Sequence, residues 1–336
     1  MSARAPESQL WNILRGGLTT RALAIVADLR VADALAAGPR RVDDLAREVG
    51  ADPDTLHRLL RALASDGVFA EEEPGIFRNN EASEVLRRGD GWDDFAHLFG
   101  GAWLRAITEL DAMGEPPFPR IFGTDFWSWL AEHPDERASF DRAMLEGWER
   151  RVGRLAALDW RGDEVVVDVG GGNGSLLVAL LQRQPGLRGV VFDLPETNRD
   201  EAALGDRIEF VAGDFLERVP PGDVYVLSTI LHDWDDDRAA AILRTIRAAA
   251  PAGARLLVLD SVIPPGNEPH GAKWLDLLML TLFAGRERDE GQWRRLLATG
   301  GFEPIRIQDG LIEASCHCRS EPPVTSTTGR RGSSGP

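Results

Sequence analysis

The residues best suited to bind a ligand form a glycine-rich loop directly after a run of β-branched residues. The segment VVVDVGGGNGS, residues 165–175, places Asp168, Gly170 and Gly172 in the pattern D-x-G-x-G-x-G. A loop of this kind between a strand and a helix brings backbone N–H groups close to a nucleotide-type ligand. A dinucleotide fingerprint would need glycine where this chain has Ser175. The pattern therefore predicts a nucleotide-type site that is not built for a dinucleotide.

The acid of this loop decides which ligand fits, because Asp168 lies two residues before the first glycine. A carboxylate repels a pyrophosphate group and attracts an ammonium group. S-adenosylmethionine carries an α-ammonium group and a sulfonium group and no phosphate, so the pattern favours this cofactor. The alternative is a tight strand-to-helix turn without a ligand. Three consecutive glycines together with the acid make that alternative the weaker one.

Acidic residues also end the next two expected strands. Asp193 lies in VVFDLPE, where its carboxylate can accept hydrogen bonds from both ribose hydroxyls. Asp214 and Phe215 lie in VAGDFLE, where the acid can bind the adenine amino group and the ring can cover its face. One such acid is a weak signal, since acids commonly cap helices. Three acids at successive strand ends predict a cofactor site at the carboxyl edge of the sheet.

His232 is the candidate general base. It lies in ILHDWDDD, where the fourth expected strand ends and a helix begins, on the ligand side of the sheet. An imidazole with an ordinary pKa of about 6.5 suits proton removal near neutral pH. A capping or buried histidine is the alternative, and it would be preferred for an isolated residue. The surrounding motifs favour the catalytic interpretation.

The first hundred residues predict a winged-helix domain. Apolar spacing predicts one helix over 20–37 and a second over 42–49. Asp52-Pro53 begins a third helix that runs to about Ser65. The segment VFAEEEPGIFRN then predicts two short strands around a Pro-Gly turn.

A winged helix can bind DNA, and the third helix carries Arg58 and Arg61. The hairpin, however, carries Glu71, Glu72 and Glu73, which would repel a phosphate backbone. The whole chain has 54 acidic and 38 basic residues and a formal net charge of −16, so nucleic acid is not an expected partner. The aliphatic N-terminal helices instead predict a homodimer, in which one subunit helps to close the pocket of the other.

The remaining composition excludes other classes of protein. No apolar run reaches the roughly 18 residues of a membrane span, and the N-terminus lacks the pattern of a signal peptide. The two cysteines, Cys316 and Cys318, predict no disulfide framework. The run Cys316-His317-Cys318 is too short and too isolated for a zinc site, so no metal is expected. These features predict a cytoplasmic protein of about two domains without a membrane partner.

From residue 164, near-continuous apolar strands alternate with helices, which predicts a parallel sheet covered on both faces. The preceding residues 92–158 are rich in aromatic side chains, which either form a core or line a pocket for a flat aromatic ligand.

Together the motifs resemble those of class I S-adenosylmethionine-dependent small-molecule O-methyltransferases, which include plant caffeate-type and bacterial natural-product tailoring enzymes. The resemblance spans about residues 10–316. Its motifs are DWRGDEVVVDVGGGNG, VVFDLPE, RIEFVAGDF, LHDWDD, AAAPAGARLLVLDSVIPPG, WLDLLMLTLFAGRER and GGFEPIRI. It implies an α/β fold with a Rossmann-like parallel-sheet methyltransferase domain and an N-terminal, mainly helical winged-helix dimerisation domain.

The expected divisions follow from this resemblance. They are 1–100 for the dimerisation domain, 101–160 for a helical linker that contributes to the acceptor pocket, 161–318 for the catalytic domain, and 319–336 for a disordered tail.

The resemblance also implies roles for individual residues. The expected catalytic residues are His232 as the base and Asp260 and Glu287 as the carboxylates that flank it. The residues expected to bind S-adenosyl-L-methionine are Asp168, Gly170, Gly172, Asp193, Asp214, Phe215 and Ser228. Those expected to bind the acceptor are Trp103, Phe140, Met144, Asp233, Met279 and Leu282.

Three positions depart from the pattern of the family. Asp260 stands where family members often carry glutamate, so the acid is one carbon shorter. Ser228 stands where plant relatives carry lysine, and Trp148 stands where a small hydroxyl residue is expected.

The implied activity is methylation of a hydroxyl, expected to be phenolic, on an aromatic natural product in bacterial secondary metabolism. One alternative is a methyltransferase fold that has diverged to hydroxylation or decarboxylation, against which His232 argues. N-methylation of an aromatic amine is a second alternative. A winged-helix transcription factor that senses a small ligand is a third, from a different class of protein.

Overall fold

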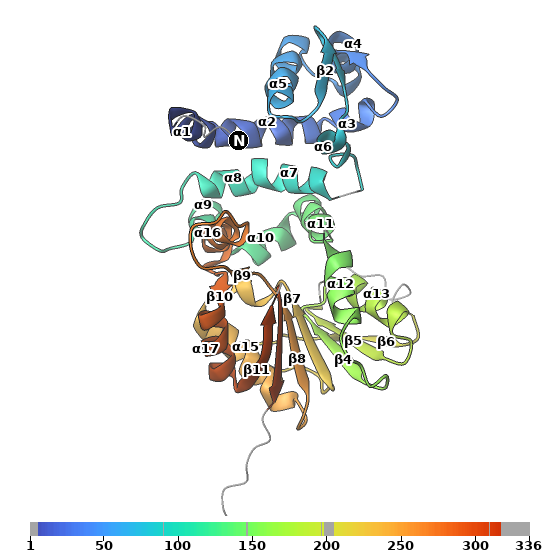
Figure 1. Ribbon diagram of the computed structural model, residues 1–336, viewed down its shortest axis with the longest axis vertical. Coiled ribbons are helices and arrows are strands. Elements are labelled where there is room, and N and C mark those ends of the chain that lie inside the picture. The colour runs from blue at the N-terminus through green and yellow to red at the C-terminus, as the bar shows by residue number, and fades with distance from the viewer. Residues whose placement is uncertain are drawn as a thin grey trace, which may run out of the picture. The chain divides into compact units, whose positions relative to one another are not determined.

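The computed structural model describes residues 6–89, 91–145, 147–195, 197, 205–308 and 310–316. The chain divides into two compact units, whose helices and strands are labelled in Figure 1. Unit 1 contains residues 1–158, 231–235 and 263–288. Unit 2 contains residues 159–230, 236–262 and 289–336. Two segments of the C-terminal half therefore belong to the unit that the N-terminal half forms.

The N-terminal part of unit 1 contains the predicted winged-helix elements. They are α1 (Pro6–Leu14), α2 (Gly16–Asp28), α3 (Val31–Ala34), β1 (Arg40–Arg41), α4 (Val42–Val49), α5 (Pro53–Ser65), β2 (Ala70–Glu73), β3 (Ile76–Arg78) and α6 (Glu81–Glu84). The strand β1 pairs with β3 and extends the predicted hairpin to three strands. The predicted start of α5 is confirmed, because the Asp52 side chain accepts a hydrogen bond from the Thr55 N–H.

The prediction of one helix over residues 20–37 is wrong, because α2 ends at Asp28 and α3 is a separate turn of helix. Between them Arg30 has a φ of 57°, a left-handed conformation that costs a non-glycine residue roughly 1–2 kcal/mol. The break redirects the chain so that Val31 and Leu35 are buried in the core of this region. Burial stabilises each such side chain by about 1.5–3 kcal/mol, which outweighs the strain.

Most of the remaining helices of unit 1 contribute side chains to one aromatic core. These are α7 (Trp92–Gly100), α8 (Ala102–Ile107), α9 (Pro117–Phe122), α10 (Phe126–Glu132), α11 (Pro134–Ala143) and α16 (Ala272–Phe283). The helix α12 (Trp148–Ala156) and the 3-10 turn η1 (Leu231–Asp233) also belong to this unit. Residues 92–158 are thus mostly helical, as predicted. The buried core includes Trp103, Phe118, Phe126, Trp129, Leu278, Met279 and Leu282.

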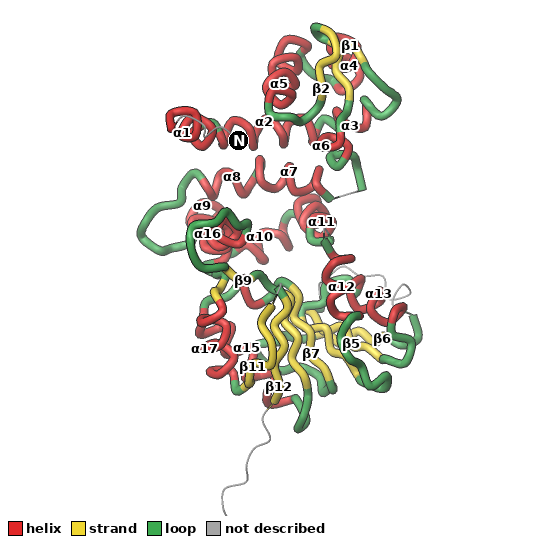
Figure 2. The backbone as a smooth tube through the Cα atoms, viewed as in Figure 1, coloured by secondary structure: helices red, strands yellow, loops and turns green. Residues whose placement is uncertain are grey.

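Unit 2 contains a seven-stranded, mostly parallel sheet (Figure 2). Its elements are β4 (Val165–Val169), α13 (Ser175–Arg183), β5 (Arg188–Asp193), β6 (Ile208–Ala212), β7 (Val224–Ser228), α15 (Asp236–Ala249), β8 (Arg255–Leu259), α17 (Glu290–Gly300), β11 (Phe302–Gln308) and β12 (Leu311–Cys316). The strand order is β11-β12-β8-β7-β4-β5-β6, with β12 antiparallel to β8 and to β11. The α/β class predicted from the sequence is confirmed.

The position of β4 makes its carboxyl end the natural place for a ligand. The strand lies between β5 and β7 and runs parallel to both. The crossover through α13 leads from β4 to β5, and the crossover through α15 leads from β7 to β8 in the opposite direction. Right-handed crossovers then put these two helices on opposite faces of the sheet. Ligands of open α/β sheets bind at such a reversal of strand order.

The expected catalytic domain, 161–318, differs from unit 2 because the chain leaves the sheet twice. Residues 231–235 and 263–288 join the helices of unit 1, since α16 contributes apolar side chains to the aromatic core. The two-residue strands β9 (Val262–Ile263) and β10 (Arg288–Asp289) pair where the chain passes between units. The tail expected at 319–336 lies outside the described residues. Over the described ranges, no helix combines the length and apolar character that a membrane crossing requires.

A histidine held by two carboxylates joins three helices of unit 1. His97 on α7 places Nδ1 2.7 Å from Oδ1 of Asp28 on α2 and Nε2 3.4 Å from Oε1 of Glu136 on α11. The hydrogen bond to Asp28, and after it that to Glu136, raises the pKa of His97 from 6.5 to about 10. The imidazolium therefore stays charged at neutral pH and links the winged-helix part to the aromatic part of this unit.

This linkage predicts a pH-dependent stability. Because the folded-state pKa of His97 is raised, its stabilisation is complete below about pH 6.5 and is lost as the pH rises towards about 10. The difference in melting temperature between the wild type and His97→Gln should therefore shrink between pH 7 and pH 10. In the control His133→Gln, the lost partner is the neutral carbonyl of Trp129, and no such trend is expected. A difference for His97→Gln that stays constant over this range would contradict the linkage.

Candidate active site

The candidate base lies in the turn η1 of unit 1 and contacts a buried carboxylate. His232 Nδ1 hydrogen bonds with Oε1 of Glu287 at 2.7 Å, and the two residues are 8 % and 2 % exposed. Since an ionised carboxylate only accepts hydrogen bonds, this contact places the ring hydrogen on Nδ1. The tautomer leaves Nε2 as the nitrogen that can accept a proton. The structure thus brings together two of the three predicted catalytic residues, which are 55 positions apart in the chain.

Further contacts hold both members of this pair. The Glu287 backbone N–H donates to Asp276 Oδ1 on α16 at 2.9 Å, and the Arg286 N–H donates to the His232 carbonyl at 2.8 Å. Asp233, which is also buried, has Oδ1 3.4 Å from Nε2 of His232. A carboxylate beside Nε2 favours the protonated ring once a proton has been accepted. Asp233 was expected to bind the acceptor, and that role stays a prediction.

Five of the six predicted acceptor residues meet in the aromatic core of unit 1. Trp103 on α8 and Met279 and Leu282 on α16 are buried there, and Phe140 and Met144 at the end of α11 pack against them while partly exposed. The Phe140 ring lies 5.5 Å from the rings of both Phe126 and Trp127, edge-on to each. Trp127 in turn stacks on Phe283 with ring centres 5.5 Å apart. This arrangement offers flat apolar surfaces to a planar ligand.

One buried polar atom of this core, Nε1 of Trp103, lacks a hydrogen-bond partner among the described residues. Trp103 as a whole is 3 % exposed. A buried donor left unpaired costs about 1–3 kcal/mol, so such atoms in native proteins often serve a ligand. The indole N–H can donate to an oxygen atom of a bound aromatic molecule.

In unit 2 the glycine loop follows β4 as predicted. Gly170 and Gly172 have φ values of 71° and 58°, which glycine adopts without strain. A Cβ on Gly170 would lie 2.5 Å from the Ile230 side chain and 3.7 Å from the Phe215 ring. A Cβ on Gly171 would lie 2.7 Å from Cγ of Asp168. Ile230 and Asp168 therefore leave no space for a side chain at Gly170 or Gly171, and the backbone of the loop stays bare at both positions.

Two of the predicted acids contact this loop. Asp168 is buried at the end of β4. Asp193 at the end of β5 accepts a hydrogen bond from the Gly172 N–H at 2.7 Å through Oδ2, and from Thr197 Oγ1 at 2.8 Å through Oδ1. A carboxylate has about four acceptor sites, so Asp193 can hold the loop and still accept a ribose hydroxyl.

The other predicted cofactor residues lie at the ends of β6 and β7. Asp214 accepts a hydrogen bond from the Leu216 N–H at 2.8 Å, which shapes the turn after β6 and brings Phe215 towards Gly170. Ser228 is the last residue of β7. Asp193, Asp214 and Ser228 therefore follow strands at the same edge of the sheet as the glycine loop, since β4–β7 are parallel.

Sequence reasoning missed a strained residue next to Ser228. Thr229 has a φ of 56°, which is an outlier for a β-branched side chain. Its N–H donates to the Leu259 carbonyl at 3.1 Å, and its hydroxyl donates to the Ser228 carbonyl at 2.6 Å. Strain of this kind persists where the surrounding structure enforces it, and such residues cluster at functional sites. No local pattern in the sequence marks this position.

The third predicted catalytic residue belongs to the other unit. Asp260 follows β8 in unit 2 and is 3 % exposed, whereas His232 and Glu287 belong to unit 1. The role of Asp260 beside the base stays a prediction. Trp148, which departs from the pattern of the family, is the first residue of α12 in unit 1.

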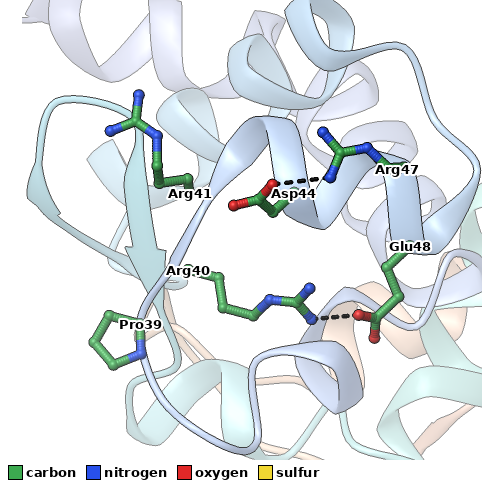
Figure 3. A pocket seen from close by; sticks show the side chains of 6 residues that line it. All are labelled: Pro39, Arg40, Arg41, Asp44, Arg47 and Glu48. Atoms are coloured by element: carbon green, nitrogen blue, oxygen red, sulfur yellow. Dashed lines mark hydrogen bonds and ion pairs between the residues drawn. The ribbon is translucent and has the colours of Figure 1, made fainter.

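A hollow in the winged-helix part lacks the chemistry of an acceptor site. Figure 3 shows its six lining residues, which are Pro39, Arg40, Arg41, Asp44, Arg47 and Glu48. Arg40 pairs with Glu48 at 2.6 Å and Arg47 pairs with Asp44 at 2.9 Å. None of the six is aromatic or nucleophilic, and four of them form ion pairs with one another within the hollow.

Comparisons with known proteins agree with the geometry of both units. The O-methyltransferase domain family matches residues 104–303, and the O-methyltransferase dimerisation domain matches residues 11–89. Phenazine O-methyltransferase PhzM of Lysobacter antibioticus is 39 % identical over 315 residues, which are 89 % of this chain and 92 % of that protein. O-demethylpuromycin-O-methyltransferase of Streptomyces alboniger is 39 % identical over 334 residues, covering 92 % and 89 %.

Solved structures show the same likeness. The crystal structure of LaPhzM superimposes with a TM-score of 0.85 at 38 % identity, covering 93 % of this chain and 99 % of that one. NcsB1 from neocarzinostatin biosynthesis, in complex with S-adenosyl-L-homocysteine and 1,4-dihydroxy-2-naphthoic acid, has a TM-score of 0.76 at 35 % identity, covering 89 % and 96 %. The chain belongs to the S-adenosylmethionine-dependent O-methyltransferase family. Hydroxylation, decarboxylation and a transcription-factor function receive no support from these comparisons, whereas one relative that is 32 % identical over 324 residues is named as a phenazine-1-carboxylate N-methyltransferase.

The residues of unit 2 fit S-adenosylmethionine. A Cβ on Gly172 would have no atom of the described residues within 4 Å, so open space lies beside the loop at this position. The carboxylate of Asp168 suits the α-ammonium group, and Asp193 suits the ribose. When bound, this cofactor supplies a methyl group that is activated by the adjoining sulfonium charge.

Substitution of Gly171 tests this loop. In Gly171→Ala the new Cβ would lie 2.7 Å from Cγ and 3.0 Å from the carbonyl oxygen of Asp168, which must then move. Losing a charge-assisted hydrogen bond costs about 1.5–3 kcal/mol, so the Kd for S-adenosylmethionine should rise by roughly ten-fold or more in calorimetry. The control Gly271→Ala adds a Cβ with nothing within 4 Å and should leave the Kd unchanged. An unchanged Kd in folded Gly171→Ala would contradict the assignment.

Proposed function

We propose that this O-methyltransferase methylates a phenolic hydroxyl of an aromatic natural product and that His232 is the general base. The observation that carries the proposal is the buried hydrogen bond of 2.7 Å between His232 and Glu287 beside an aromatic core. A phenol with a pKa of about 10 is mostly protonated at neutral pH, so its oxygen needs a base when it attacks a methyl group.

Three acids act with the base in this proposal. Glu287 fixes the ring orientation through Nδ1 and stabilises the imidazolium after proton transfer. Asp233, whose Oδ1 is 3.4 Å from Nε2, orients the acceptor hydroxyl at the nitrogen that takes the proton. Asp260 is proposed to flank the base as well, from the resemblance to the family alone.

The residues that hold the cofactor act by position and charge. Asp168, Gly170, Gly172 and Asp193 are proposed to bind the methionine and ribose parts, and Asp214, Phe215 and Ser228 to bind near the adenine side. Alignment of the two reactants then supplies much of the rate, because effective molarities of well-held pairs reach about 10⁵ M or more.

The acceptor is proposed to be planar, aromatic and oxygenated at more than one position. Trp103, Phe140, Met144, Met279 and Leu282 supply flat or adaptable apolar surface from one cluster. The unpaired Nε1–H of Trp103 is suited to a second oxygen of the acceptor. Relatives are named for fused or substituted aromatic acceptors, such as phenazine, 3-amino-4-hydroxybenzoate and 2,7-dihydroxy-5-methyl-1-naphthoate. A pathway of antibiotic biosynthesis and a cytoplasmic location also stay predictions.

The proposal is tested with a panel of acceptors and two variants. The panel contains 1,4-dihydroxy-2-naphthoate, 3-amino-4-hydroxybenzoate and 2,7-dihydroxy-5-methyl-1-naphthoate, and mass spectrometry should show the gain of one CH₂ on oxygen. His232→Ala should lower kcat by roughly 100-fold or more, since it removes the base. Glu287→Gln should lower kcat less, because its amide carbonyl can still accept from Nδ1. Both variants should bind S-adenosylmethionine as the wild type does.

The control for these variants is His57→Ala, which replaces a histidine on α5 of the winged-helix part. Its kcat should equal that of the wild type. A kcat of His232→Ala equal to that of the wild type would contradict the assignment of His232 as the general base. A gain of one oxygen atom, or methylation of the amino group of 3-amino-4-hydroxybenzoate alone, would show that the proposed chemistry is wrong.

The dimerisation domain points to a homodimer, which we also propose. The start of unit 1 exposes five large apolar side chains at 60–78 %, and these are Leu10, Trp11, Ile13, Leu14 and Leu18. Monomeric proteins rarely expose such a contiguous apolar patch. A second copy of the chain is the proposed occupant, since these side chains lie on α1 and α2 and all but Leu10 fall within residues 11–89, which match the dimerisation domain.

A double charge substitution tests the dimer. Leu14→Glu combined with Leu18→Glu should convert the protein to a monomer in light scattering at micromolar concentration, because two carboxylates cannot be buried without partners. Met113→Glu is the control, since Met113 is 77 % exposed outside this patch and should not change the molar mass. A monomeric wild type, or a dimer that survives the double substitution, would contradict the proposal.

A further inference from the structure

Four consecutive residues of unit 1 contact the turn that carries the base. A Cβ on Gly285 would lie 2.2 Å from the His232 carbonyl oxygen, so only glycine fits there. The Arg286 N–H donates to that same oxygen at 2.8 Å, and Glu287 binds the imidazole. Arg288 completes the series, and no role follows for it from the motifs of the sequence.

Arg288 is a fully buried arginine that spans the turn. It is 0 % exposed, its Nη1 donates to the Leu231 carbonyl at 2.9 Å, and its Nη2 donates to the Trp234 carbonyl at 2.9 Å. One side chain thus binds the backbone immediately before His232 and two residues after it. Burying a charged guanidinium group costs free energy unless its N–H groups find acceptors. The two backbone carbonyls supply such acceptors for Arg288.

The geometry of the guanidinium group explains why an arginine stands there. Its donors lie in a rigid planar fork, so two carbonyls that it binds together are held at a set separation. The Leu231 carbonyl begins the short 3-10 turn Leu231–Asp233, and the Trp234 carbonyl directly follows it. Hydrogen-bond geometry in such a turn is poorer than in an α-helix. Holding both ends of the turn leaves His232 with its side-chain torsions alone, and Glu287 fixes those.

We propose that Arg288 is a positioning residue, which holds the turn 231–234 so that His232 Nε2 meets the acceptor hydroxyl. This inference rests on the proposed function of His232 as the base. A misplacement of about 1 Å can cost roughly 100-fold in rate, so a rigid turn has a direct effect on catalysis. Arg288 acts through His232 and needs no contact with the cofactor or the acceptor.

A double-mutant cycle tests the proposal on the first member of the acceptor panel that the wild type methylates. Arg288→Gln should lower kcat by roughly 10- to 100-fold in the wild type and by less than about two-fold in His232→Ala, where no base remains to be placed. Arg288→Lys should stay impaired, because one ammonium group does not present a planar fork. The control Arg294→Gln removes an exposed arginine that pairs with Glu290 on α17, and it should leave kcat unchanged.

Hydrogen exchange gives a readout that needs no acceptor. The peptide that contains residues 231–235 should exchange at least about ten-fold faster in Arg288→Gln than in Arg294→Gln, while peptides of α16 exchange equally. If Arg288→Gln does not fold, Arg288→Lys is used for both measurements.

The outcomes separate this inference from the proposed function. If Arg288→Gln lowers kcat by the same factor in the wild type and in His232→Ala, the positioning role of Arg288 is wrong, while the proposed function stands. Unchanged exchange at residues 231–235 would overturn it as well. A wild type that methylates none of the panel would count against the proposed function, and the exchange data would still decide whether Arg288 holds the turn.

Discussion

The hydrogen bond between His232 and Glu287 is the constraint on which the proposed active site depends. A base works only when one nitrogen is held and the other is presented, and a buried carboxylate at 2.7 Å meets that condition. Removing one partner of a buried pair costs about 3–5 kcal/mol, because the remaining group is left without compensation. The Arg286 N–H and the Arg288 guanidinium group donate to backbone carbonyls of the turn, and Asp276 on α16 accepts from the Glu287 N–H. The geometry that stabilises this segment is also the geometry that the proposed catalytic role of His232 requires.

Features with a local cause could be predicted from the sequence. The strands of unit 2 follow from runs of apolar and β-branched residues, and the glycine loop follows from backbone that must be bare. The N-cap at Asp52 follows from one side chain and its own helix. His232 could be placed because it follows a strand in a parallel sheet, where the carboxyl ends of strands share one edge. Each of these inferences uses residues that lie close together in the chain.

The features that could not be predicted depend on residues far apart in the chain. The break at Arg30 is enforced by the burial of Val31 and Leu35 against other helices, which propensity alone does not show. Glycine is needed at position 285 because the carbonyl of His232, 53 residues earlier, lies close to it. The proposed role of Arg288 depends on the carbonyls of Leu231 and Trp234, which lie on either side of His232. The return of residues 263–288 to the helical unit has the same kind of cause, since it is decided by the apolar face of α16. Tertiary contacts override local patterns at these positions.

The aromatic stretch shows how burial separates two interpretations that the sequence left open. Phe118 and Phe126 are at most 1 % exposed and pack edge to face at 5.2 Å, so they are core residues. Phe140 and Met144 are only partly buried, and they therefore have surface to offer to a ligand. Trp103 combines both properties, because its ring is packed while its Nε1–H lacks a partner among the described residues. One cluster can thus stabilise unit 1 through its inner rings and select an oxygenated aromatic acceptor through its outer ones.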